Sequence, residues 1–346
     1  MDPDPVTAQR LAAQLLAGPP ASSPAEVAGR LLAIQAQDPR GARLAIRARS
    51  TGLTAADVDR SLTAERSVVV TWLNRGTLHL VRSEDYWWLH ALTTPPLLAG
   101  NARRLAQEGV PPGDAGRGVA VVERALAAEG PLTRQQLSGR IAAAGVRTKG
   151  QALVHILGLA AFRGLTVRGP VTAGGQAYAL ARDWLGPPPR RFDRDRALAE
   201  LARRYLAGHG PASDRDLAKW SGLPLADARR GLSQIAAGLA DRDDGLAELA
   251  GRPPAPSQPA SPRLLGAFEP LLLGWASRDP VVGPHAAAII SGGVFRPFAL
   301  VAGQAAATWS IAAGEVVVSP LTALPEADSA ALRADAGDVR RFLALA

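Results

Sequence analysis

The stretch ALAAEGPLTRQQL, residues 125–137, recurs as YLAGHGPASDRDL at residues 205–217, an offset of about 80 positions. In each copy a helical pattern of apolar residues stops at Gly-Pro. A threonine or serine then stands at the position of an N-cap, and a second helical pattern begins with a polar turn. A helix, a stop, a cap and a second helix form the opening of a helix-turn-helix. The repeat therefore predicts two related units within one chain.

β-hairpins are predicted beside these helices. The β-rich runs SVVVTWL (67–73) and TLHLV (77–81) are separated by Asn74-Arg75-Gly76, with glycine at the tight position of the turn. A second strand pair, LTVRG and QAYAL, is expected around residues 170–175, and GLAEL at 245–249 gives a weaker strand signal. Helices followed by a hairpin are typical of a winged-helix unit, so the sequence predicts three such units in tandem.

The remaining elements are predicted from apolar spacing, N-cap residues and Gly or Pro stops. Helices are expected at 7–17, 24–35, 54–63, 83–92, 148–164, 194–208, 213–219, 224–239 and 328–345. The predicted fold class is α+β and predominantly helical, with tandem winged-helix units and a C-terminal antiparallel β-rich module. The expected parts are units at 1–112, 113–190 and 191–250, a Pro-rich linker at 251–262, and the C-terminal module with its closing helix at 263–346.

Composition narrows the function. The net charge of +8 and a pI near 10.9 favour a polyanionic partner over a simple solubility effect. The absence of cysteine excludes disulfides, thiolate zinc sites, iron–sulfur clusters and a cysteine nucleophile. The histidines show no ligand-like pairing and no nucleotide-binding motif is present, so we expect no metal and no cofactor. With neither a signal peptide nor an apolar run of membrane-spanning length, we expect a cytoplasmic protein without a membrane partner.

Two glutamines stand at the mouth of a basic segment in LLAIQAQDPRGARLAIRARS, residues 31–50. Asp38 precedes a proline, which is expected to end the preceding helix around Ala36. In extended or one-turn 3₁₀ geometry, Gln35 and Gln37 can direct their amides to one side. On the pattern alone, capping or solvated glutamines are the favoured interpretation. Asp38 is expected to be a cap or turn residue, with an electrostatic contribution to a site as the alternative.

Other candidates lie in the hairpin and among the cations. Strand alternation places Thr77 and His79 on one face, either lining the pocket of the glutamines, with His79 contacting phosphate or water, or turned to solvent. Candidates for phosphate contact follow the glutamines, stand at the hairpin tip, or bracket the predicted recognition helix of the second unit. They are Arg40, Arg43, Arg47, Arg49, Arg75, Arg147, Lys149 and Arg163.

Three stretches together resemble the AlkZ-like winged-helix DNA glycosylases of bacteria: LLAIQAQDPRGARLAIRAR, TWLNRGTLHLV and LLLGWASRD…SGGVFRPFALVAGQAAATW. The resemblance covers nearly the whole chain, residues 6–345. The family's functional signature is Gln, an aliphatic residue and Gln, and a second branch ends in Asp instead. Gln35 and Gln37 match the first branch, with the small Ala36 between them.

The resemblance implies an enzyme of base excision repair acting on double-stranded DNA. It would remove bulky N7- or N3-alkylated purines, unhook interstrand crosslinks and give self-resistance to a DNA-alkylating natural product. It also implies that Gln35 and Gln37 hold a water against the sugar C1′ of the damaged nucleotide. An N7-alkylguanine is already a cation and departs as a neutral base, so a positioned water needs little acid catalysis. An amide offers both an acceptor and a donor to orient that water.

Lysine usage bears on the reaction type. Only Lys149 and Lys219 are present, both in the helix-turn-helix repeats rather than near the glutamines, so we expect a monofunctional glycosylase without lyase activity. The N-terminal amine is the alternative group that could form a Schiff base. The alternatives are a non-catalytic winged-helix DNA-binding protein, such as a regulator or lesion binder, and a protein-interaction scaffold. We expect a monomer, because three winged-helix units can surround a duplex alone.

Overall fold

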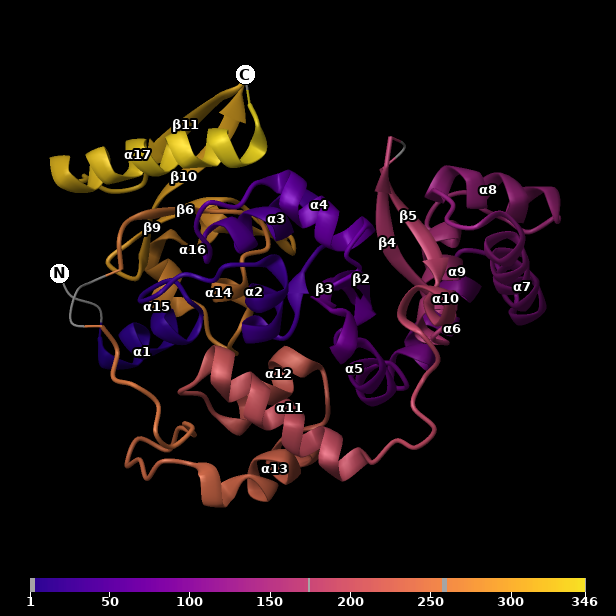
Figure 1. Cartoon of the computed structure of the whole chain (residues 1–346), viewed down its shortest axis with the longest axis horizontal. Coiled ribbons are helices and arrows are strands. Elements are labelled where there is room, and N and C mark those ends of the chain that lie inside the picture. Colours follow the sequence, from indigo (N-terminus) through magenta and orange to yellow (C-terminus); the bar gives the residue numbers. More distant parts are fainter. Residues whose placement is uncertain (1–3, 174, 257–259, 346) are drawn as a thin grey trace. The chain divides into compact units, whose positions relative to one another are not determined.

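The computed structural model describes residues 4–173, 175–256 and 260–345, so residue 174 of the predicted second hairpin and residues 257–259 of the predicted linker lie outside it. The chain forms two compact units (Figure 1). Unit 1 combines Met1–Val58 with Leu198–Ala346, and unit 2 is the continuous segment between them. The first and last parts of the chain therefore fold together. The consecutive parts expected from the sequence remain a prediction.

The fold is α+β, about half helical, with antiparallel sheets, which confirms the α+β class and the C-terminal antiparallel sheet. The tandem winged-helix units remain a prediction. The helices of unit 1 include α1 (Pro5–Ala13), α2 (Pro24–Leu31), α3 (Pro39–Arg47), α12 (Asp214–Ser221), α13 (Leu225–Gln234), α14 (Pro270–Leu273), α15 (Asp279–Val282), α16 (Ala286–Ile289) and α17 (Glu326–Leu343). The two boundaries between the units fall inside α4 (Ala55–Thr63) and α11 (Arg194–His209). The helices of unit 2 include α5 (Tyr86–Thr93), α6 (Leu97–Gln107), α7 (Pro112–Glu129), α8 (Arg134–Ala143), α9 (Ala152–Phe162) and α10 (Ala181–Leu185).

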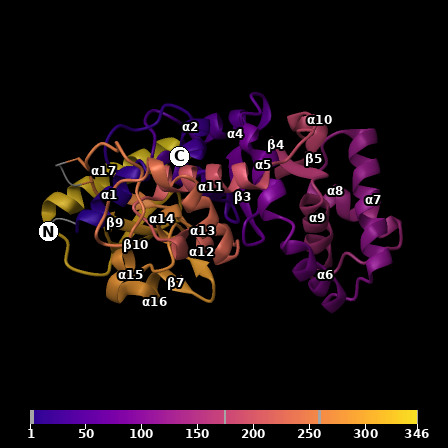
Figure 2. The same cartoon turned by 90° about the horizontal axis from the view of Figure 1, so that it is seen from below.

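Unit 2 contains both predicted hairpins in one antiparallel sheet. Its strands β2 (Val68–Leu73), β3 (Thr77–Arg82), β4 (Thr166–Thr172) and β5 (Gly175–Leu180) lie in the order β3-β2-β4-β5. The turn between β2 and β3 has positive φ at Asn74 and Gly76, as such a tight connection requires. Helix α7 packs against α8, α9 and β5 (Figures 1 and 2).

The N-caps predicted from the repeat are confirmed. Thr133 is the N-cap of α8 and Ser213 is the N-cap of α12, each in a capping box closed by the residue three positions later. The expected hairpin at GLAEL is wrong, because the segment makes only isolated bridges, Ala212 with Ala247 and Leu239 with Leu249. Ala247 and Leu249 of this segment each pair with a different part of the chain, so no two-stranded hairpin forms.

Unit 1 contains the predicted C-terminal sheet and closing helix. Strands β6 (Arg263–Leu265), β9 (Phe298–Val301), β10 (Gln304–Ala312) and β11 (Glu315–Pro320) are antiparallel in the order β11-β10-β9-β6. The short pair β7 (Ile290–Ser291) and β8 (Val294–Phe295) stands apart. Helix α17 packs on β6 and β11 and buries Leu332, Val339 and Phe342. No helix in the described part of the chain is both long and apolar enough to cross a membrane.

Candidate active site

Gln35 and Gln37 meet through a hydrogen bond between their side chains. The expected helix end near Ala36 is wrong, because α2 stops at Leu31 and Leu32 turns with φ +63°. Gln35 instead ends the two-residue strand β1 (Ile34–Gln35), where residues two apart face the same side. Gln35 Nε2 donates to Gln37 Oε1 at 2.7 Å, and Gln35 is buried whereas Gln37 is exposed. The buried amide therefore orients the exposed one, in agreement with the expectation that both share one space.

Asp38 caps helix α3 directly after the pair. Its Oδ1 accepts a hydrogen bond of 2.7 Å from the Gly41 N–H, and Pro39 occupies the first helical position. The expectation of a cap is confirmed. The Asp-Pro step is thus a helix start, and the basic segment after it is helical.

The arginines after the glutamines differ in burial. Arg40 is exposed, and Arg43 is half-buried with Nη1 donating to Pro39 O at 2.9 Å. Arg47 and Arg49 lie in the interior, 4% and 0% exposed. A guanidinium that is buried and paired within the protein cannot also reach a phosphate. We therefore leave Arg47 and Arg49 out of the proposed DNA contacts.

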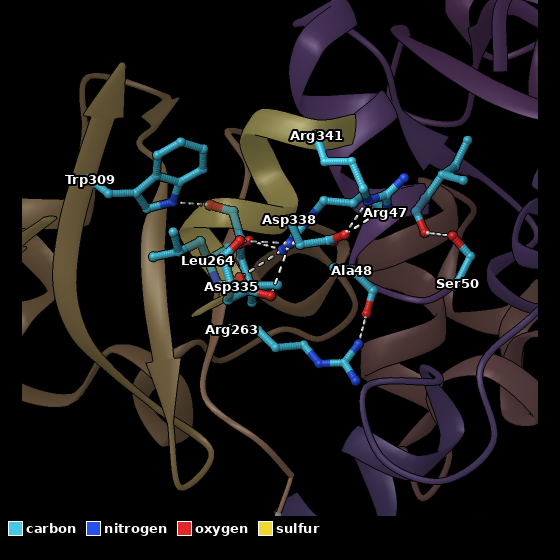
Figure 3. Close-up of polar contacts among 11 residues, drawn as sticks. Arg47, Ala48, Ser50, Arg263, Leu264, Trp309, Asp335, Asp338 and Arg341 are labelled. Atoms are coloured by element: carbon cyan, nitrogen blue, oxygen red, sulfur yellow. Dashed lines mark hydrogen bonds and ion pairs between the residues drawn. The ribbon is translucent and has the colours of Figure 1, made fainter. Parts of the chain in front are cut away.

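Arg47 is held by acidic residues of α17 (Figure 3). Its Nη1 donates to Asp335 Oδ1 at 2.9 Å and to Asp338 Oδ2 at 3.2 Å. Its Nη2 donates to Asp335 Oδ2 at 3.0 Å and to Leu264 O at 2.7 Å. Two parallel bonds to one carboxylate fix a guanidinium in position as well as orientation. The C-terminal end of α3 is thereby tied to α17 and β6.

Arg49 forms a second interior cluster. Its Nη2 donates to Glu269 Oε1 at 2.5 Å and to Gln14 Oε1 at 2.7 Å, and its Nη1 donates to Ala45 O at 3.0 Å. Glu269 is also the N-cap of α14, where Oε1 accepts from the Leu271 N–H at 3.2 Å. The residues after α3 are therefore joined to the start of α14.

A pocket of about 420 Å³ lies at the C-terminal end of α3, lined by Arg47, Arg263, Asp335 and Asp338 and by the turn after the helix. Its charges have partners within the protein. Arg47 pairs with both aspartates, and Arg263 donates to Ala48 O (Figure 3). Because these charges pair with one another and with the main chain, we interpret the pocket as a structural feature that holds α3 in place.

Thr77 and His79 lie in β3 of unit 2. The register pairs His79 with Thr71, so Thr71, Thr77 and His79 share one face of the hairpin. His79 is 2% exposed, which rules out the solvent-facing alternative for this side chain, and its Nδ1 lies 2.9 Å from Thr77 O. Burial, aided by the charge of Arg75, lowers the pKa of His79 to about 3, against the opposing effect of the bond to Thr77. His79 is therefore neutral near pH 7 and does not bind phosphate as a cation.

The other predicted cations also belong to unit 2. Arg75 at the hairpin tip is half-buried, whereas Arg147, Lys149 and Arg163 are exposed. Arg147 and Lys149 precede α9, and Arg163 is its C-cap residue, so the three bracket this helix as expected. Across residues 4–173, 175–256 and 260–345, no group of three or more His, Asp or Glu side chains is placed to hold a metal ion.

Sequence reasoning misses the partners of the buried arginines. Glu269 lies 220 positions from Arg49, and Asp335 lies 288 positions from Arg47. The signal that could have located α3 is the step Asp38-Pro39, an N-cap residue followed by proline at the first helical position. A helix starting there places the later arginines beside apolar residues at helical spacing.

The chain as a whole has the fold of a DNA glycosylase. It matches the solved structure of Streptomyces sahachiroi DNA glycosylase AlkZ with a TM-score of 0.78 and 25% sequence identity, covering 99% of this chain and 97% of that one. An interstrand DNA cross-link repair glycosylase from Streptomyces sahachiroi is 28% identical over 362 positions, covering 97% of this chain and 95% of that protein.

A protein-family model identifies the group of DNA glycosylases to which the chain belongs. The model for AlkZ-like DNA glycosylases matches residues 28–342, a span that contains both glutamines and the whole of α3. This chain belongs to the AlkZ-like DNA glycosylase family, as its resemblance in three stretches of sequence predicts. Membership of this family makes DNA the substrate.

Proposed function

We propose that this chain is a monofunctional DNA glycosylase that hydrolyses the N-glycosidic bond of N7- or N3-alkylated purines, with Gln35 and Gln37 as its catalytic pair. The observation that carries the proposal is the 2.7 Å hydrogen bond between these two amides, in a member of a DNA glycosylase family. The name of the Streptomyces sahachiroi relative supports extending the substrates to interstrand crosslinks, and bulky adducts of the same purine nitrogens are proposed with them. Self-resistance to a DNA-alkylating natural product is the role proposed with them.

The reaction needs a positioned water more than a strong acid. The water oxygen bonds to C1′ as the bond from C1′ to the purine nitrogen breaks, and the electron pair of that bond leaves with the base. An N7-alkylpurine is a cation before the reaction and neutral after it, so its departure requires no proton. The water's proton passes to solvent.

The amide pair suits this task. Gln37 Oε1 has a second lone pair beside the one that accepts from Gln35, and its Nε2 supplies donors. Gln37 therefore orients the water, and the buried Gln35 holds Gln37 in place. Holding a reacting water in the attack geometry is a large source of rate enhancement.

We assign supporting roles to further residues. The carboxylate of Asp38, next to Gln37 in the chain, adds a field that favours the positive charge developing on the sugar. Thr77 and the neutral His79, both in β3, are proposed as uncharged hydrogen-bonding groups of the enzyme. The proposed phosphate contacts are Arg40, Arg43, Arg75, Arg147, Lys149 and Arg163.

The placement of the lysines supports a single chemical step without strand cleavage. A lyase needs an amine that forms a Schiff base with the sugar. Lys149 precedes α9 and Lys219 lies in α12, so neither belongs to the β1–α3 segment that carries the glutamines. The product is expected to be an intact strand with an abasic site.

The test measures base release from a duplex carrying one N7-methylguanine and, in parallel, from a duplex carrying a bulky natural-product adduct. Abasic sites are revealed by alkaline cleavage on a gel. We expect release by the wild-type protein and its loss in Gln35→Ala, Gln37→Ala and the double variant, with DNA affinity retained. Gln304→Ala, at an exposed glutamine that begins β10, is the matched control and should act as wild type.

Two outcomes contradict the proposal. Tight, salt-sensitive DNA binding without release from either duplex supports the non-catalytic DNA-binding protein instead. An equal loss of binding and release in the glutamine variants assigns Gln35 and Gln37 to the DNA-binding surface. Strand breaks before alkali treatment would contradict the monofunctional assignment alone.

A further inference from the structure

The first turn of α3 touches the main chain of the segment after β6. A Cβ added at Gly41 would lie 2.3 Å from Ala267 O and 3.1 Å from Ala267 C. A Cβ added at Gly266 would lie 3.0 Å from Leu44 Cβ and 3.1 Å from Gly41 Cα. The two backbones therefore approach each other with no side chain between them; a Cβ at Gly41 would collide with Ala267 O, and a Cβ at Gly266 would fit only tightly.

Gly41 has no conformational reason to be glycine. It lies inside a helix and its φ is not positive, so alanine would suit the backbone better there. The contact with Ala267 is the remaining reason. A glycine retained inside a helix at a cost to helix stability marks a close approach that the fold needs.

This contact is connected directly to the glutamines. The Gly41 N–H is the donor that Asp38 Oδ1 accepts at 2.7 Å, and Asp38 follows Gln37 in the chain. A displacement of Gly41 away from Ala267 moves the donor that holds Asp38. The backbone carrying Gln37 moves with it.

The other end of α3 is fixed to the same segment. Arg47 donates to Leu264 O, and Arg49 pairs with Glu269 (Figure 3 shows the Arg47 contacts). Residues 263–269 thus hold α3 at its first turn through the Gly41 contact, at its last residue through Arg47, and just beyond its end through Arg49. The helix cannot absorb an added methyl group at Gly41 by sliding along its axis without breaking these bonds.

We propose that Gly41 and Gly266 are positioning residues of the glycosylase reaction, which set the place of the Gln37 amide through the contact of α3 with Gly266–Ala267. The inference rests on the proposed catalytic role of Gln35 and Gln37. The two glycines do not touch the substrate. They act through Asp38 and the start of α3, where a misplacement of about 1 Å is enough to cost about 100-fold in rate.

The test is Gly41→Ala, measured under single-turnover conditions with saturating protein on the N7-methylguanine duplex. We expect the rate constant for base release to fall about 100-fold while the dissociation constant for DNA changes less than about threefold. Saturating protein separates displacement from partial unfolding, because a smaller folded fraction leaves this rate constant unchanged. The control is Gly337→Ala in α17, an exposed position where an added Cβ meets nothing within 4 Å.

A second variant covers the case in which Gly41→Ala does not fold. Gly266→Ala brings the new Cβ to 3.0 Å from Leu44 Cβ and 3.1 Å from Gly41 Cα, a tight contact that a small shift of α3 relieves. We expect a folded protein with a smaller reduction of the rate constant, about tenfold, in the same direction. An unchanged rate constant in both folded variants overturns the inference, as does a parallel loss of rate and DNA affinity.

A readout independent of activity separates this inference from the proposed function. In protein labelled at glutamine side-chain nitrogen, the Nε2–H signals of Gln35 report its hydrogen bond to Gln37. We expect these signals to shift in Gly41→Ala and to stay in place in Gly337→Ala. If the wild type releases no base but the signals shift, the proposed function fails and the positioning contact stands; if base is released and the signals do not move, only the inference fails.

Discussion

Arg49 and Glu269 form an ion pair in the interior of unit 1, with 2.5 Å between Nη2 and Oε1 and neither side chain exposed to solvent. Taking both charges out of water is costly, so such a pair contributes less to stability than its geometry suggests. Removing one partner is different, because it leaves the other charge buried and alone. The segments that carry Arg49 and Glu269 must therefore both be in place for unit 1 to be stable.

Arg49→Met is expected to lower the free energy of unfolding by about 3–5 kcal/mol, since Glu269 is left as an unpaired buried carboxylate. Arg49→Met combined with Glu269→Leu should recover most of this loss. Urea unfolding of the two variants and the wild type measures both effects. A double variant no more stable than Arg49→Met would show that the partners do not compensate each other.

The buried His79 makes stability depend on pH. It binds a proton in the unfolded chain below about pH 6.5, whereas burial lowers its pKa in the folded protein to about 3. Between these values the unfolded state holds more protons, so stability falls as the pH falls, by up to about 1.4 kcal/mol per pH unit. His79→Gln should remove this contribution.

The measurement is urea unfolding of wild type and His79→Gln between pH 8 and pH 4. We expect the two profiles to run parallel above about pH 7.5 and to diverge below about pH 6.5, where the wild type loses stability more steeply. Parallel profiles over the whole range would mean that His79 takes up its proton as readily in the folded protein.

The same substitution is expected to change the free energy of unfolding in opposite directions at two buried threonines of unit 2. Thr71 is 0% exposed and its Oγ1 has no hydrogen-bond partner among the described residues. Thr93, 2% exposed, donates from Oγ1 to Leu89 O at 2.9 Å and accepts from the Asn74 N–H at 3.3 Å. Valine has nearly the shape of threonine, so Thr71→Val should raise the free energy of unfolding by about 1 kcal/mol and Thr93→Val should lower it by about 1–2 kcal/mol. Thermal and urea unfolding compare them, and equal signs would contradict the hydrogen-bond assignment.

Exposed cations of unit 2 are expected to set the salt dependence of DNA binding. Arg147→Gln and Lys149→Gln should each weaken binding similarly on all sequences and reduce the slope of log K against log salt concentration by about 1. Fluorescence anisotropy titrations between 50 and 200 mM salt measure the slope. Arg333→Gln is the control, because Arg333 is exposed but paired with Glu326. A slope as steep as that of wild type in Arg147→Gln and Lys149→Gln would remove these residues from the DNA-binding surface.

Local signals in the sequence predict much of this fold. The Asn-Arg-Gly turn, the capped helices of the repeat and the closing helix depend on contacts between near neighbours, and each is present. The start of α3 is the informative failure. Asp38-Pro39 indicates both the end of one element and the beginning of another, and only the second is correct. The chain had already left its preceding helix at Leu31.

The candidate site is predictable in part for a similar reason. Two amides separated by one residue are within reach of each other whenever the backbone is extended, so the pair could be identified from the motif. The interior position of Arg47 and Arg49 could not, because an arginine is rarely buried unless it is paired, and the acids that pair with these two lie far away in the sequence. Those acids, Asp335 and Glu269, lie more than 200 positions further along the sequence.

Unit 1 is built from two segments that are separated in the sequence by unit 2, so during synthesis it can finish folding only after unit 2 has been made. A ribosome adding about 5–20 residues per second needs on the order of 10–40 s to make the 217 positions from Arg47 to Leu264. During that interval unit 2 emerges complete, while the nascent segment with Gln35 and Gln37 lacks the strand and turn that later hold α3. The two glutamines are translated long before the residues that hold α3 in place.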